Sequence, residues 1–280
     1  MLPLFMRSVK FLVGLAFVGV LMWALLWTVV GLVQEPPQPT AESVFHEEHP
    51  KELKLASDGP FGKFDNRQLQ RGYQVYSEVC AACHTLGLVS FRELEGIGYT
   101  EAEVKKIAKD FDAHAKQPTY DPKTGDRAER GNLPSDRFPH IPYAGDGTPP
   151  DLTLITKARH GGAAYVYSLL TGYEEKQPAD LLKRFPGAKT PDGLHYNPYF
   201  ANLNLAMPPP LTADGQVTYL DGTVATKDQM AKDVSAFLVW TAEPTLQSRH
   251  RYGMAVVLFL LLTTLLAWGA YQTVWRGVKH

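Results

Sequence analysis

The chain has 280 residues, of which 45% are hydrophobic and 20% are charged. This composition can build a substantial core, and the length suits one large domain or two small ones. The sequence has no internal repeat, no glycine-rich phosphate loop and no basic patch with interleaved aromatic residues, so nothing in it indicates nucleotide or nucleic-acid binding.

The first predicted element is an apolar helix near the N-terminus. Residues 11–33 contain no charged residue, and a bilayer is crossed by about 20 helical residues. A cleaved signal peptide is the alternative, but its apolar region is usually shorter and precedes a small-x-small site, whereas this stretch ends in Val33-Gln34-Glu35-Pro36. We therefore expect a retained transmembrane anchor within residues 1–36.

Both cysteines of the chain lie in one motif at the end of a predicted helix. Apolar residues at helical spacing predict the helix over residues 66–79, and Cys80-Ala81-Ala82-Cys83-His84 follows. This is the attachment pattern of a c-type haem, in which each thiol closes a thioether on a vinyl group and the imidazole ligates iron. A redox dithiol or half of a zinc site is the alternative, but no third cysteine exists to help complete a zinc site. Haem c is attached outside the cytoplasm, so the motif also predicts export of the surrounding domain.

Two contrasting segments follow the motif. Thr100 and Glu103 have the spacing of a capping box, which predicts a helix over residues 101–112. Residues 116–150 are rich in proline, glycine and charged residues and have little hydrophobic periodicity. They predict a long loop that is either functional or wrapped around another part of the molecule.

Further helices and a hairpin are predicted toward the C-terminus. Asp151 can cap a helix over residues 153–158, and helical spacing resumes over residues 163–170. Asp221-Gly222 is a turn signal that predicts a hairpin over residues 216–225. A second capping box at Thr226 then starts a helix that ends before Pro244.

A second apolar stretch, residues 252–275, predicts a C-terminal anchor within residues 249–280. Four basic residues lie toward the chain ends beyond the two stretches: Arg7, Lys10, Arg276 and Lys279. They predict that both termini are cytoplasmic, with the domain of residues 37–248 outside. Arg249 and Arg251 favour the opposite orientation, but the site of haem attachment outweighs them.

The segment between the anchors is acidic. All 29 acidic residues but only 22 of the 28 basic ones lie within residues 34–248, a net charge of about −7. Such an excess usually reflects only a solvated surface. It would also steer a basic soluble partner and make association with it sensitive to salt.

The second axial ligand decides what a haem at this motif does, because an open site binds small molecules whereas two protein ligands favour electron transfer. Only Met207 and Met230, of six methionines, lie outside the anchors and the chain start. Met207 precedes Pro208-Pro209-Pro210, which make a stiff loop, whereas Met230 lies on an apolar helix face typical of core packing. Met207 is favoured, and His160 is the best histidine alternative.

Seven short motifs, in this order, carry a resemblance to one family: Arg71-Gly72-Tyr73-Gln74-Val75-Tyr76, Cys80-x-x-Cys83-His84, Pro149-Pro150-Asp151-Leu152-Thr153, Ala158-Arg159-His160-Gly161-Gly162, Tyr196-Asn197-Pro198-Tyr199-Phe200, Met207-Pro208-Pro209-Pro210 and Asp221-Gly222-Thr223. They resemble the cytochrome c1 family over about residues 60–275. The resemblance implies a mainly α, cytochrome c-type haem domain with long loops and a small β-hairpin, flanked by two transmembrane helices.

The resemblance also implies roles for individual residues. By position, His84 and Met207 are the axial ligands of one haem c, and the two cysteines are its thioether attachments. Arg159 and Tyr165 match positions that contact the haem propionates in the family. Relative to the family, the loop of residues 143–148 is short, and no extra cysteine pair can form the disulfide of some bacterial relatives.

The implied function is that of the haem subunit of a cytochrome bc1 complex, a quinol–cytochrome c oxidoreductase of the inner membrane. The expected partners are cytochrome b, the Rieske iron-sulfur protein and a soluble or membrane-anchored cytochrome c, within a dimeric complex. The haem domain would be periplasmic, and the chain itself would carry electrons without making or breaking a substrate bond. The alternatives are a membrane-tethered monohaem carrier that acts alone, and a haem enzyme or sensor with an open sixth position.

Overall fold

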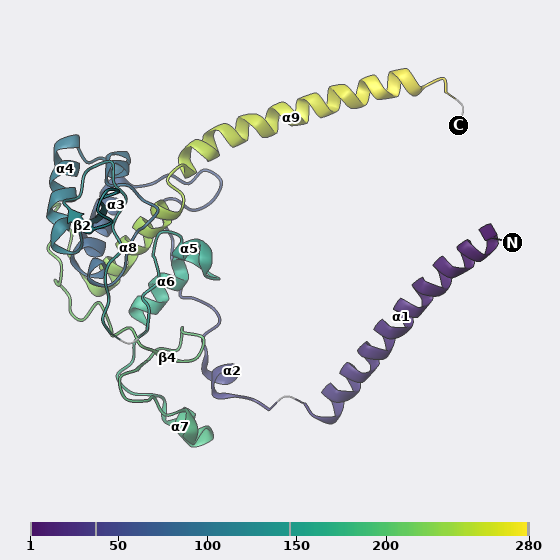
Figure 1. The fold of residues 1–280 in the computed structure, drawn as a ribbon, viewed down its shortest axis with the longest axis horizontal. Coiled ribbons are helices and arrows are strands. Elements are labelled where there is room, and N and C mark those ends of the chain that lie inside the picture. The colour runs from purple at the N-terminus through teal and green to yellow at the C-terminus, as the bar shows by residue number, and fades with distance from the viewer. Residues whose placement is uncertain (1, 37, 146, 279–280) are drawn as a thin grey trace. The chain divides into compact units, whose positions relative to one another are not determined.

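The computed structural model describes residues 2–36, 38–145 and 147–278. The chain divides into two units, residues 1–44 and 45–280 (Figure 1). In the first unit, helix α1 (Leu2–Gln34) includes a stretch, Ser8–Gln34, that is long and apolar enough to cross a membrane. The short helix α2 (Ala41–Phe45) follows a proline-rich connection.

The second unit is mainly helical, as expected. Its helices are α3 (Asn66–Glu78), α4 (Glu101–Asp110), α5 (Ile155–Ala158), α6 (Gly162–Thr171), α7 (Ala179–Arg184), α8 (Lys227–Ala242) and α9 (Leu246–Trp275). Short 3-10 helices lie at Cys80–Ala82, Phe91–Ile97, Phe111–Ala113 and Pro186–Ala188. Two small antiparallel sheets pair β1 (Gln117–Tyr120) with β2 (Arg127–Arg130) and β3 (His195–Tyr196) with β4 (Asn204–Leu205).

Local capping signals explain where the predicted helices begin. The Thr100 hydroxyl accepts from the Glu103 backbone N–H, and the Glu103 carboxylate accepts in return from the Thr100 backbone, so the capping box of α4 is confirmed. Thr226 caps α8 in the same way through the Gln229 backbone N–H. The reciprocal half of that second box is missing, because the Gln229 side chain donates to Asp233 instead.

Helices α3 and α8 cross at the centre of the core. Gly72 permits the close approach, since a Cβ at this position would lie 2.1 Å from the Asp233 carbonyl oxygen. Around the crossing, Tyr73 and Tyr76 of α3 pack their rings on Phe237 of α8, with centroids 5.7 and 5.9 Å apart. These contacts hold the C-terminal end of α3, and therefore the motif that follows it, against α8.

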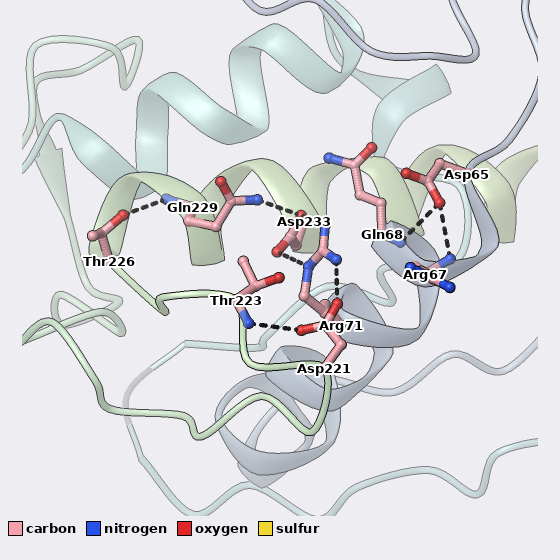
Figure 2. Close-up of polar contacts among 9 residues, drawn as sticks. All are labelled: Asp65, Arg67, Gln68, Arg71, Asp221, Thr223, Thr226, Gln229 and Asp233. Carbon is pink, nitrogen blue, oxygen red and sulfur yellow. Dashed lines mark hydrogen bonds and ion pairs between the residues drawn. The ribbon is translucent and has the colours of Figure 1, made fainter.

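One partly buried arginine joins the same two helices to a loop (Figure 2). The Arg71 Nε donates to the Asp233 carboxylate at 2.9 Å, and its Nη1 donates to Asp221 at 2.7 Å. The Asp233 side chain is fully buried. The Asp221 carboxylate also accepts from the Thr223 backbone N–H, which closes a local turn.

The prediction of a hairpin over residues 216–225 is wrong. The structure has no strand there, because the Asp221 carboxylate bonds the turn and Arg71, while Gln216 bonds Thr212 and Pro210. The hairpins lie elsewhere: β1 and β2 fall inside the segment expected to be a long loop, and β3 pairs with β4.

The prediction that Asp151 caps a helix is also wrong. Its carboxylate accepts instead from the backbone N–H groups of Thr153 and Gly87, and Leu154 is the N-cap residue of α5.

Ion pairs link the start of α9 to α5, another helix of the second unit. Glu243, just before the helix, pairs with Lys157 of α5 at 2.7 Å and with Arg249 in the first turns of α9. Helix α9 is also long and apolar enough to cross a membrane. The pairing offsets the Arg249 charge, one of the two that favoured the opposite orientation of the chain.

Candidate functional site

The end of α3 delivers the two cysteines and the histidine in one tight turn. Val79 caps α3, and a 3-10 turn follows at once over Cys80–Ala82. The backbone N–H groups of Cys83 and His84 both donate to the Cys80 carbonyl oxygen, at 3.1 and 2.9 Å. The two thiols and the imidazole are therefore held within a single turn of chain.

Pro150 and Tyr76 hold His84, a role that their places in the quoted motifs did not predict. Its Nδ1 lies 2.8 Å from the Pro150 carbonyl oxygen and must carry the proton to donate to it. The Tyr76 hydroxyl donates to the His84 carbonyl oxygen at 3.0 Å. Burial lowers the pKa of His84, so the ring is neutral at pH 7 and its Nε2 is available to a metal.

All six predicted site residues line one cavity of about 530 Å³, a size typical of cofactor sites. They are Cys80, Cys83, His84, Arg159, Tyr165 and Met207. Most of the remaining wall is apolar: Val79, Leu152, Ile155, Val166, Leu169, Leu170, Phe200, Leu205, Val234 and Leu238. These side chains come from segments that are far apart in the sequence, so the fold is required to assemble the cavity.

Met207 reaches the cavity from the segment after β4. The strand pair β3–β4 positions the start of this segment, and three prolines follow Met207. The Tyr173 hydroxyl donates to the Met207 carbonyl oxygen at 3.0 Å. Tyr173 was not predicted to have this role, because a contact between residues 34 positions apart leaves no local signal.

The structure separates Met207 from its two competitors. Met230 is fully buried in the core and does not line the cavity. His160 is exposed and does not line it either. Of the three candidate ligands, Met207 is the one that lines the same cavity as His84.

Arg159 and Tyr165 lie on the cavity wall at the junction of α5 and α6. Arg159 is the C-cap residue of α5 and Tyr165 lies in the first turn of α6. Burial raises the pKa of Tyr165, and the positive charge of Arg159 partly opposes that rise. The short loop also reaches the cavity, through Tyr143, Gly147 and Thr148.

The donor set fits a covalently attached haem. An apolar cavity supplies two thiols, one neutral imidazole and one thioether, and Arg159 adds a cation that could face a carboxylate. Two cysteines and one histidine do not complete a closed structural zinc site, which takes four such ligands. The fold and the site define a c-type cytochrome with two apolar helices that suit membrane anchoring.

Comparison with known proteins gives the family. A sequence model described as the Cytochrome C1 family matches residues 55–278. Cytochrome c1 of Rhodospirillum rubrum is 40% identical over 79% of this chain and 86% of that protein. The mitochondrial "Cytochrome c1, heme protein" of Saccharomyces cerevisiae is 40% identical over 84% of this chain and 74% of that protein. The mitochondrial "Cytochrome b-c1 complex catalytic subunit" of Candida albicans is 38% identical over 84% of this chain and 80% of that protein.

The chain belongs to the cytochrome c1 family. As a member of this family it carries covalently bound haem c.

Proposed function

We propose that this chain is the haem-bearing electron-transfer subunit of a cytochrome bc1 complex, which takes one electron from a Rieske iron-sulfur protein and passes it to a cytochrome c. The observation that carries this proposal is the single cavity shared by the attachment motif and Met207. Membership of a complex is further supported by the name of the relative from Candida albicans.

Each site residue has a distinct task in this proposal. Cys80 and Cys83 would attach the haem covalently, and His84 and Met207 would ligate its iron; all four residues line the cavity. When bound, the haem supplies a redox centre that exchanges one electron at a time. The bond between His84 Nδ1 and Pro150 keeps the ring in the orientation and tautomer that leave Nε2 free.

The walls of the cavity set the environment of that centre. Apolar side chains from α6 and α8 line the cavity, and an apolar environment favours the less charged state of a redox site. Arg159 would face the haem propionates, with Tyr165 beside it. In this proposal the thiols, the imidazole and the thioether are all engaged by the haem, and the chain transfers electrons without making or breaking a substrate bond.

We further propose that the chain lies in a bacterial inner membrane, with the haem domain of residues 37–248 in the periplasm and both termini in the cytoplasm. The two apolar helices support anchoring at both ends. The basic residues beyond them support the orientation, and the pairing of Arg249 with Glu243 weakens the main contrary signal.

The axial ligand is tested by comparing two methionine variants. Met207→Leu removes the sixth ligand, so the reduced protein should bind carbon monoxide much faster than wild type, in which the methionine must first dissociate. Met230→Leu is the matched control, since it removes a buried sulfur outside the cavity and should cost less than about 1.5 kcal/mol of stability. If Met207→Leu binds carbon monoxide as slowly as wild type does, Met207 is not the ligand.

The partners are tested by mild detergent solubilisation of membranes that contain the tagged chain. The haem band of this chain should purify together with cytochrome b and an iron-sulfur protein. Quantitative recovery of the chain alone, under conditions that keep quinol oxidation intact, would instead support a carrier that acts by itself.

A further inference from the structure

The segment that begins at Met207 has few ways to hold its own backbone. Pro208, Pro209 and Pro210 carry no backbone N–H, so three successive residues can donate no backbone hydrogen bond. The segment must be restrained through its carbonyl oxygens and its packing. The side chains that reach those oxygens therefore control where the Met207 side chain lies.

Two side chains from other parts of the chain bond these carbonyl oxygens. The Tyr173 hydroxyl donates to the Met207 oxygen at 3.0 Å, and the Gln216 Nε2 donates to the Pro210 oxygen at 2.9 Å. Gln216 is itself fixed, because its Oε1 accepts from the Thr212 backbone N–H at 2.8 Å. Side-chain hydrogen bonds thus hold the segment at Pro210, its last proline, and at Met207, where the donor is Tyr173.

The chain before Met207 is also constrained. Leu203, which is 1% exposed, has a φ of +64°. Among the residues that the structure describes, no other residue except glycine has a left-handed backbone. Its N–H donates to the Phe200 carbonyl oxygen, and its own carbonyl accepts from the Asn197 N–H, each at 2.8 Å. A bulky residue holds such a conformation only where surrounding contacts enforce it, so the path into β4 and Met207 is specified.

Tyr173 lines a second hollow, of about 1010 Å³, beside the haem cavity. Pro209 lines this second hollow whereas Met207 and Pro208 line the haem cavity, and Leu170 lines both. If the Met207 segment moved away from the haem cavity, the second hollow would give it room. The hydrogen bond from Tyr173 opposes this movement.

We propose that Tyr173 is a positioning residue whose hydroxyl, by holding the Met207 carbonyl oxygen, keeps the Met207 thioether on the haem iron and the sixth position closed. This inference rests on the proposed function, in which Met207 is the axial ligand. Tyr173 does not touch the reacting atoms and acts through the Met207 backbone. A single hydrogen bond of this kind should change the population of the ligand-off state about 2- to 10-fold.

The test compares Tyr173→Phe with Tyr199→Phe in the full-length haem protein. Tyr199 is a neighbour whose ring packs on Gly172 and whose hydroxyl has no hydrogen bond among the described residues. The first readout is the sulfur-to-iron charge-transfer band of the oxidised protein as temperature rises. The second is the rate at which carbon monoxide binds the reduced protein, which is limited by dissociation of the methionine.

Tyr173→Phe should lose the band at lower temperature and bind carbon monoxide about 2- to 10-fold faster, whereas Tyr199→Phe should match wild type. Equal behaviour of Tyr173→Phe and wild type, or equal changes in both variants, would overturn the inference. If Tyr173→Phe does not accumulate, Gln216→Leu tests the same restraint at Pro210 and should shift both readouts in the same direction. A wild-type protein that lacks the band would instead refute Met207 as ligand, which is a failure of the proposed function.

Discussion

Arg71 shows how one residue can bond two carboxylates of different exposure. The Asp233 side chain is fully buried, whereas that of Asp221 is 30% exposed. The Thr223 backbone N–H and then Arg71 hold the pKa of Asp221 down at about 2. The Asp221 carboxylate therefore ties its loop to α3 only while it is ionised.

The sign of the pH effect follows from this lowered pKa. Asp221 contributes stability that is fully present above about pH 4, the usual pKa of aspartate, and is lost as pH falls toward about 2. Asp221→Asn should therefore lose less thermal stability than wild type between pH 4 and pH 2. The measurement is the unfolding temperature of the full-length protein across that range, with Asp192→Asn, an exposed aspartate, as control. Parallel curves for wild type and Asp221→Asn would contradict the role given to Asp221.

At the scale of elements, the crossing of α3 and α8 positions the haem motif. The motif follows α3 directly, so any change in the angle or distance of the crossing moves Cys80 and His84 relative to the rest of the cavity. Gly72 lies against the backbone of α8, where an added Cβ would meet the Asp233 carbonyl group and the Phe237 Cβ rather than the end of a flexible side chain.

Gly72→Ala should destabilise the fold by about 3 kcal/mol or more, because the added Cβ meets a backbone oxygen that cannot move without separating the helices. Gly96→Ala is the matched control, since a Cβ there has no neighbour within 4 Å. Denaturant unfolding of the two variants gives the comparison, and haem content after membrane isolation gives a second one. A Gly72→Ala protein as stable as Gly96→Ala would show that the helices do not need this close approach.

At the scale of the whole molecule, the segment of residues 34–248 has a net charge of about −7 from 22 basic and 29 acidic residues. Ion pairs within this segment, such as those of Arg71 with Asp221 and Asp233, leave the excess of acidic groups unchanged, and that excess creates a negative field around the domain. Such a field attracts a basic cytochrome c and is screened over about 10 Å at 0.1 M salt.

Reduction of a basic cytochrome c by the complex should therefore slow roughly threefold or more as ionic strength rises from about 0.01 to 0.3 M. A small uncharged electron acceptor is the control, because its rate should hardly depend on salt. A cytochrome c rate that is indifferent to ionic strength would rule out steering by the acidic domain.

Local signals predicted part of this structure well. The helix capped by Thr100 was predicted because its capping box lies within four residues. The haem motif was identified because its two cysteines and its histidine lie within five residues. The prediction of a hairpin over residues 216–225 was wrong, because Arg71, 150 positions away, donates a hydrogen bond to the Asp221 carboxylate at the expected turn. The bond from Tyr173 to Met207 and the close approach at Gly72 also depend on tertiary contacts that leave no pattern in the sequence.

The most direct test of the central claim is a potentiometric titration of the haem in native membranes, followed optically. Ligation by His84 and Met207 in an apolar cavity predicts a midpoint potential well above zero, as expected for a histidine–methionine haem. A strongly negative midpoint would indicate two histidine ligands or an open sixth position. It would contradict both the assignment of Met207 and the place of this chain at the high-potential end of a quinol-oxidising complex.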